Sequence, residues 1–323
     1  MLACGVALAG AVTAAHAAPC AGNPNALGTS RIMTLSARDM PVLGLVDYGR
    51  TLPLAEGEVV LTFDDGPKPP YTNAVLKALA NECVRAVFFM VGRQARAHPD
   101  VARMVHAAGH TIGTHTYSHP LYRMPPDVAE REIDAGIASV AAALGTSRAM
   151  APFFRFPGLF RTPEAERYLF SRALSSWSID VDSDDWKRID SNAFLERTMA
   201  RLEARRGGIV LMHDIQPVTA LTLPALLNAL KTRGYRIVHV VPSGAVQPAL
   251  PGLVATSQPA PPDRPPSVAV PIPPAPVADN RKPAEPATQR REGVIAEARP
   301  LASNPFQRIF EPPPSQGTFR WSP

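Results

Sequence analysis

The chain has 323 residues, of which 46% are hydrophobic and 19% are charged. This length allows one large domain with appendages or two small domains, and the apolar content is ample for a buried core. The net charge of +5 comes from scattered arginines that form no basic stripe, so nucleic-acid binding has no support. The oligomeric state is left open, with a monomer as the default.

The first 17 residues have the pattern of a signal peptide. The stretch from Leu2 to Ala15 is apolar but too short to span a bilayer, and it leads to an A-x-A-like cleavage site at residues 15–17. No Lys or Arg precedes Arg31, so the usual charged start is missing. We expect an exported protein, periplasmic or secreted, with no transmembrane segment and with a lead-in segment over residues 18–55. In an oxidising compartment Cys20 and Cys83 are then available to form one disulfide.

Short apolar strands alternate with amphipathic helices from residue 56 to residue 242. The strand candidates are residues 59–63, 86–91, 111–114, 153–156, 174–179, 209–213 and 236–241. Apolar residues at helical spacing over 133–144 and over 223–230 give the intervening helices a buried stripe. This alternation predicts an α/β fold with a parallel sheet, in which functional residues gather at the carboxyl ends of the strands.

The composition changes after Pro242. Prolines accumulate there, in strings such as residues 259–262. A Pro/Ala-rich segment with few large apolar residues buries too little surface to offset the entropy of ordering. We predict that residues 243–323 form a disordered or extended tail.

Two adjacent carboxylates end the first of these strands. Asp64 and Asp65 follow the apolar run 59–61 and precede a Gly-Pro turn. Like charges side by side at the end of a buried strand repel each other and lose hydration, so they usually require a cation, an arginine or a shifted protonation state. An ordinary Asp-Gly turn with a solvated carboxylate is the simpler alternative.

A pair of histidines follows the third strand. His115 and His119 are four residues apart, a spacing that puts both imidazoles on one side of a helical turn. With one carboxylate they make a ligand set for Zn²⁺ or a similar divalent ion that leaves positions open for water and substrate. Open positions indicate a catalytic site. Four other histidines are expected to be ordinary core or surface residues: His98, His106, His110 and His239.

Five motifs in this order resemble those of the polysaccharide deacetylases with a NodB homology domain, carbohydrate esterase family 4. They are TFDDGP (62–67), HTYSH (115–119), RFP (155–157), VDSDDW (181–186) and LMH (211–213). The resemblance implies a catalytic domain over residues 56–242 with a distorted, often incomplete (β/α) barrel. It also implies a metal-dependent hydrolase that removes N-acetyl groups from a polysaccharide containing N-acetylglucosamine, whether chitin-like, peptidoglycan or exopolysaccharide.

The resemblance further implies a role for each residue of the reaction centre. Asp65, His115 and His119 hold the metal, with Zn²⁺ as first choice and Co²⁺, Mn²⁺ or Ni²⁺ also compatible. Asp64 is the general base that takes a proton from the metal-bound water, and His213 is the general acid that protonates the departing amine.

Two more assignments come from the third motif. Arg155 is similar to the family arginine that pairs with the base, and its guanidinium suits a carboxylate that must stay ionised and oriented. Gly158 stands where the family usually has a tyrosine whose backbone N–H helps to bind the oxyanion. The backbone donor is kept, but the loop loses a side chain and gains freedom.

The fourth motif has two possible registers for the residue that supports the acid. Counting back from Trp186 selects Asp182 as the acceptor for the ring N–H of His213, and Asp180 is the alternative. Trp186 and Leu211 are assigned to an apolar pocket for the acetyl methyl group, with plain core packing as the alternative. Two other functions stay open: an esterase that removes O-acetyl groups, as from acetylated xylan, and a carbohydrate-binding relative that has lost activity.

Overall fold

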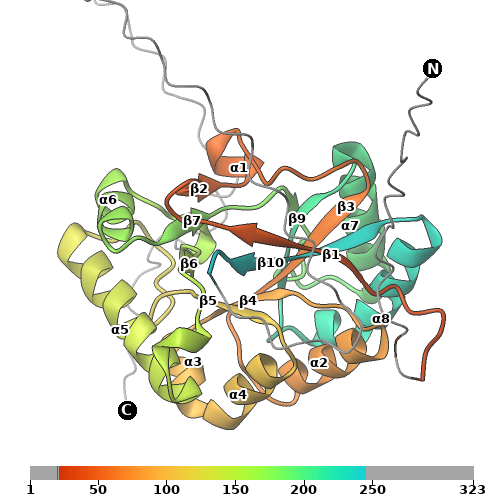
Figure 1. Ribbon diagram of the computed structural model, residues 1–323, viewed down its shortest axis with the longest axis horizontal. Coiled ribbons are helices and arrows are strands. Elements are labelled where there is room, and N and C mark those ends of the chain that lie inside the picture. Colours follow the sequence, from red (N-terminus) through yellow and green to blue (C-terminus); the bar gives the residue numbers. More distant parts are fainter. Residues whose placement is uncertain (1–19, 21, 245–323) are drawn as a thin grey trace, which may run out of the picture. The chain divides into compact units, whose positions relative to one another are not determined.

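The computed structural model describes residue 20 and residues 22–244. The predicted signal peptide, and the predicted tail from residue 245 onward, lie outside these residues. In the described part, parallel strands are enclosed by helices (Figure 1). None of these helices has the length and apolarity that crossing a bilayer requires.

Ten strands form the sheet, and every pairing between them is parallel. Their bounds are β1 Thr29–Leu35, β2 Val42–Leu43, β3 Glu58–Asp64, β4 Val87–Met90, β5 Thr111–Thr114, β6 Phe153–Phe154, β7 Ser175–Trp177, β8 Val181–Asp182, β9 Gly208–His213 and β10 Arg236–Pro242. The eight α-helices are α1 Leu45–Tyr48, α2 Tyr71–Asn81, α3 Gly92–Ala97, α4 Pro99–Ala107, α5 Pro126–Leu144, α6 Pro163–Ser171, α7 Ser191–Arg205 and α8 Pro217–Thr232, and short 3₁₀ turns cover Ser147–Ala149 and Pro157–Leu159.

The strands follow an incomplete barrel. The sheet runs β1-β10-β3-β4-β5-β6-β7-β2, and β3 also pairs with β9, which pairs with β8. Residues 178–180 join β7 to β8 without a ladder between these two strands, so the hydrogen-bonded ring stays open in the described chain. The predicted α/β fold with a distorted, incomplete barrel is confirmed, and all seven predicted strands are present. The sequence analysis missed β1, β2 and β8.

Alternation along β3 separates two cores. Val59, Leu61 and Phe63 belong to a core shared with the helices, which includes the predicted apolar stripe of α8. Val60 belongs to a second core made of strand and loop residues inside the barrel, with Trp177 at its centre. Because side chains alternate along a strand, Thr62 and Asp64 share the inner face with Val60. The last inward side chain of β3 is therefore a carboxylate.

Helix α5 shows how local sequence sets the element bounds. It starts with Pro126, whose missing N–H costs nothing in the first helical turn, and it ends at Gly145 in the left-handed conformation. Ile133 and Val140 are fully buried on its inner face. Full burial of such a side chain contributes about 1.5–3 kcal/mol.

A disulfide joins the lead-in segment to the barrel. Cys20 bonds to Cys83 across a sequence separation of 63 residues, as predicted. A cross-link of this kind restricts the unfolded chain, so we expect Cys83→Ser to lower the free energy of unfolding by about 2–4 kcal/mol. Urea unfolding of oxidised wild type and variant measures this difference, and coincident curves would contradict the expectation.

Candidate active site

The polar ends of four strands meet at one edge of the barrel. Asp64 is the last residue of β3 and His213 the last of β9, and the two are direct partners in the parallel register. His115 follows β5 and Arg155 follows β6. Because all strands run in the same direction, their carboxyl ends bring these four side chains to the same edge, as the sequence predicted.

The two adjacent aspartates point to different partners. Asp65 has a φ of 78°, a left-handed conformation that is uncommon outside glycine. This turn lets Asp64 face Arg155 at 2.7 Å while Asp65 faces the two histidines. The alternative of an Asp-Gly turn with a solvated carboxylate is wrong, because the side chain of Asp65, which precedes the glycine, is 14% exposed and contacts both histidines, and Asp64 is 2% exposed.

Arg155 is held from three sides and is fully buried. Its guanidinium donates to Asp64 Oδ1, to Thr62 Oγ1 and to the carbonyl oxygen of Ser178, and it lies 4.3 Å from the ring centroid of Phe89. Burial lowers the pKa of Arg155, whereas the charge of Asp64 opposes that shift. The predicted contact between Arg155 and Asp64 is confirmed.

The predicted metal ligands form a compact set. Asp65, His115 and His119 offer ligand atoms that all lie within 4.8 Å of one another. Asp65 Oδ1 lies 2.9 Å from Nε2 of His119 and 3.4 Å from Nε2 of His115. These three residues come from the turn after β3 and the loop after β5.

The donor chemistry of this set fits a divalent cation. Nδ1 of His115 lies 2.7 Å from the carbonyl oxygen of Arg155, which can only accept, so Nδ1 carries a proton, and in the neutral imidazole Nε2 offers a lone pair. Asp65 Oδ1 is buried and has no hydrogen-bond partner. Burial favours the neutral acid, but the three nearby histidines hold the pKa of Asp65 well below its usual range. A lone pair and a carboxylate oxygen that face each other require a cation or a proton between them.

A carboxylate from α5 holds the loop that carries the second histidine. Glu132 accepts hydrogen bonds from the backbone N–H groups of Tyr117 and Ser118 and from the Ser118 hydroxyl. The backbone N–H of His119 donates to Thr116 Oγ1. Thr116 and His119 both have left-handed φ values, 63° and 64°. A tight loop, rather than a helical turn, therefore puts the two imidazoles on the same side.

His213, the predicted acid, is supported by Asp185, not by Asp182. Nδ1 of His213 lies 2.7 Å from Asp185 Oδ1, and Asp185 Oδ2 also accepts the backbone N–H of His213 and the hydroxyl of Thr219. The prediction for Asp182 is wrong because its carboxylate is turned into its own loop. Asp182 accepts from the backbone N–H of Asp184 and from Nε1 of Trp186.

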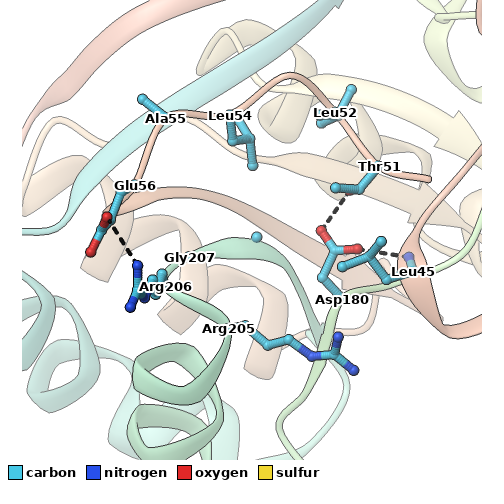
Figure 2. Close-up of a pocket in the computed structure, with 11 residues that line it drawn as sticks. Leu45, Thr51, Leu52, Leu54, Ala55, Glu56, Asp180, Arg205, Arg206 and Gly207 are labelled. Carbon is cyan, nitrogen blue, oxygen red and sulfur yellow. Dashed lines mark hydrogen bonds and ion pairs between the residues drawn. The ribbon is translucent and has the colours of Figure 1, made fainter. Parts of the chain in front are cut away.

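The alternative, Asp180, is also wrong. Its carboxylate accepts hydrogen bonds from Thr51 Oγ1 and from the backbone N–H groups of Leu45 and Ile209. Figure 2 shows it in a pocket lined by the lead-in segment and the turn before β9. Ile209 is four residues before His213, which is about 13 Å along a strand. Asp180 therefore ties the lead-in segment to the barrel.

Substitution of the two aspartates should separate their roles. Burial lowers the pKa of His213, but the charges of Asp185 and of the aspartates at the end of β3 outweigh it and raise the pKa to about 10. Asp185→Asn removes the nearest negative charge, so the imidazolium should lose its proton at lower pH. We expect the alkaline limb of the kcat profile to move down by at least about one pH unit. Asp182→Asn is the matched control and should leave that limb in place; the reverse pattern would contradict the assignment.

Asp214, a buried aspartate that was not predicted, supports the turn after β3 that carries Asp65. Asp214 accepts the backbone N–H of Gly66 and the hydroxyl of Thr72. A Cβ on Gly66 would lie 2.1 Å from Asp214 Oδ2, so only glycine fits there. The only signal in the sequence is that Asp214 directly follows the catalytic candidate His213.

The remaining predicted substrate residues are Gly158, Trp186 and Leu211. Gly158 has a φ of 57°, and a Cβ there would lie 2.7 Å from the ring of Phe160. The aromatic ring of Phe160 thus occupies the space of the missing side chain. Trp186 is half-buried and Leu211 is 8% exposed. Their assignment to an acetyl pocket stays a prediction.

These features define a class of site. A carboxylate held by an arginine and an imidazole held by a carboxylate lie on neighbouring strands, beside three residues that fit a divalent cation. A base and a separate acid around a polarising cation are typical of the active site of a hydrolase.

Comparisons with known proteins identify the family. The sequence profile described as "Polysaccharide deacetylase" matches residues 52–171. A "Chitooligosaccharide deacetylase" of Rhizobium leguminosarum bv. trifolii is 31% identical over 200 residues, which cover 55% of this chain and 88% of the relative. The chain belongs to the polysaccharide deacetylase family, carbohydrate esterase family 4, and is a hydrolase of that family.

Two solved structures show what the fold alone leaves undecided. A Bdellovibrio bacteriovorus peptidoglycan deacetylase superposes with a TM-score of 0.60 at 28% identity, over 74% of this chain and 63% of that chain. A family pseudoenzyme from Bacillus anthracis has a TM-score of 0.52 at 26% identity, over 57% and 63% of the two chains. Since a protein named as a deacetylase and one named as a pseudoenzyme both have this fold, the fold alone does not define the roles of individual residues.

Proposed function

We propose that this protein is a divalent-metal-dependent deacetylase that removes N-acetyl groups from a polysaccharide containing N-acetylglucosamine. The observation that supports it most is that two adjacent aspartates have different partners. Asp64 is held by Arg155 and stays outside the ligand set, while Asp65 joins the two histidines. The printed names of the relatives, which include chitooligosaccharide and peptidoglycan deacetylases, support the substrate class.

Two different side chains carry out the two proton transfers. A divalent cation, when bound by Asp65 and the two histidines, supplies Lewis acidity toward the carbonyl and lowers the pKa of water. Asp64 takes the proton of the attacking water, and Arg155 orients that carboxylate. His213 gives a proton to the departing amine. Because its Nδ1–H is engaged by Asp185, the proton for the amine is on Nε2.

Zn²⁺ is the proposed ion. Two imidazole nitrogens and one carboxylate oxygen are a ligand set that catalytic zinc sites use, with a position left for substrate or water. Co²⁺, Mn²⁺ and Ni²⁺ accept the same donors. Metal analysis of the purified protein, followed by chelation and restoration with each ion, identifies the ion that restores activity.

Export to the periplasm or the exterior is part of the proposal. The disulfide between Cys20 and Cys83 supports it, because such bonds persist in oxidising compartments. Fractionation of cells that express the full chain tests it: recovery in the cytoplasm at full length would contradict export.

Acetate release from a panel of polymers tests the function. The panel holds N-acetylglucosamine oligomers, peptidoglycan and acetylated xylan, each with and without a chelator. The proposal predicts acetate from the N-acetylated substrates, loss of release with chelator and recovery on adding Zn²⁺. Acetate from xylan alone would make the protein an O-acetyl esterase, and no release from any polymer would support an inactive relative.

A further inference from the structure

A second cluster of basic side chains lies at the other edge of the barrel. Arg85 precedes β4 and His110 precedes β5, so both lie at the amino ends of strands whose carboxyl ends carry the candidate active site. A pocket of about 120 Å³ opens between them, and its basic lining is completed by His106, Arg148 and His239. No aspartate or glutamate is among its lining residues.

Arg85 lacks a counter-charge. Its side chain is half-buried, and its guanidinium makes no hydrogen bond or ion pair with any residue in the described ranges. The guanidinium lies over Gly109, where a Cβ would come within 2.6 Å of Cζ. Burial lowers the pKa of Arg85. A partly buried cation without a partner is costly, and the cost disappears when an anion binds.

The two buried histidines have fixed tautomers. Nδ1 of His110 accepts the backbone N–H of Ala86, so its proton is on Nε2, which donates to no residue of the described chain. The Thr111 hydroxyl donates to the carbonyl oxygen of Val240, so its oxygen accepts from Nε2 of His239. Nδ1 of His239 is buried without a partner in the described part of the chain. The pocket lining therefore offers one unused N–H donor, Nε2–H of His110, whereas the buried Nδ1 of His239 carries a lone pair and cannot donate to an anion.

The electrostatics of the pocket agree with this geometry. Burial and the nearby Arg85 lower the pKa of His110 to about 3, and burial, His110 and Arg85 do the same for His239. Burial is the larger cause of both shifts, and the positive charge of Arg85 adds to it by disfavouring further positive charge. An anion would reverse that effect, and charge-assisted hydrogen bonds from a guanidinium are strongest with carboxylate and phosphate oxygens.

We propose that this pocket binds a small oxyanion group, a phosphate or a carboxylate, through the guanidinium of Arg85 and Nε2–H of His110. The volume limits the ligand to one such group, because pockets for larger ligands span about 300–1,000 Å³. The expectation that His110 is an ordinary core residue would then be incomplete. This proposal does not depend on the deacetylase activity.

Anion binding to the full chain tests the site. Calorimetric titrations with inorganic phosphate and with acetate, at constant ionic strength set with chloride, show which oxyanion the wild type prefers. Arg85→Gln should weaken binding of that anion at least tenfold, and it should not lower Tm in chloride because Arg85 has no partner to lose. Arg96→Gln, which removes an exposed arginine from α3, is the matched control and should bind as the wild type does. Equal affinity in wild type and Arg85→Gln, or no binding of either anion, would overturn the proposal.

A second readout needs no variant. In ¹⁵N-labelled wild type, the same anion should shift the ring nitrogen resonances of His110 and leave those of His98 in place. Shifts confined to histidines outside the pocket would also overturn the proposal.

Discussion

Replacing Asp64 with asparagine should lower kcat for acetate release about 10³-fold, within the range measured for general acid–base catalysis. The amide has nearly the same shape but cannot take a proton from water. Asp64 is outside the proposed ligand set, so the variant should keep its metal. Steady-state kinetics and metal analysis of the same preparation give both results.

Asp39→Asn is the control for this substitution, because Asp39 is exposed and lies before β2. It should leave kcat at the wild-type value. If Asp64→Asn kept full activity, the carboxylate would not be the base. If it lost its metal, Asp64 would be a ligand, and the assignment of Asp64 as the base and Asp65 as the ligand would be wrong.

Arg155→Ala should be the most destabilising substitution at the site. It leaves Asp64 buried without its partner and removes hydrogen bonds to Thr62 and Ser178. Removal of one member of a buried ion pair costs about 3–5 kcal/mol, which corresponds to a fall in Tm of roughly 6–20 °C for a domain of this size. Thermal unfolding measured by circular dichroism gives the shift.

Arg167→Ala supplies the comparison, because Arg167 pairs with Glu164 on the exposed surface of α6. Exposed pairs contribute little, so its Tm should stay near the wild-type value. Equal shifts in the two variants would mean that the buried pair contributes no more to stability than an exposed one.

The pattern of strands and helices was predictable because both faces of the central strands are apolar. Residues 58–64 are all buried, and the apolar run at residues 59–61 predicted β3 because buried strands are rich in apolar side chains. The three missed strands carry weaker signals. β2 and β8 have two residues each, and β1 has exposed or half-buried positions in four of its seven residues. Such strands form because hydrogen bonds to neighbouring strands stabilise them, and their own sequences do not predict them.

The candidate site was predictable where residue type and order are sufficient. Asp64, Asp65, His115, His119, Arg155 and His213 lie where the motifs placed them. The order of residues could not decide which of several aspartates faces His213, because that depends on the conformation of the loop after β8, where Asp184 has a φ of 60°. Asp182 accepts hydrogen bonds from Asp184 and Trp186 within this loop, whereas Asp185 contacts His213 at the end of β9.

Supporting residues from distant elements were beyond the sequence for the same reason. Glu132 lies within α5, where a charged residue is ordinary, yet its carboxylate holds the loop before His119. Only the packing of α5 against that loop shows its role.

Calorimetric titration of metal-free protein with Zn²⁺ tests the central claim most directly. The wild type and Asp64→Asn should each bind one ion with similar affinity, and His119→Ala should lose most of that affinity. A single zinc site that survives His119→Ala and disappears with Asp64→Asn would contradict the assignment of ligands and base.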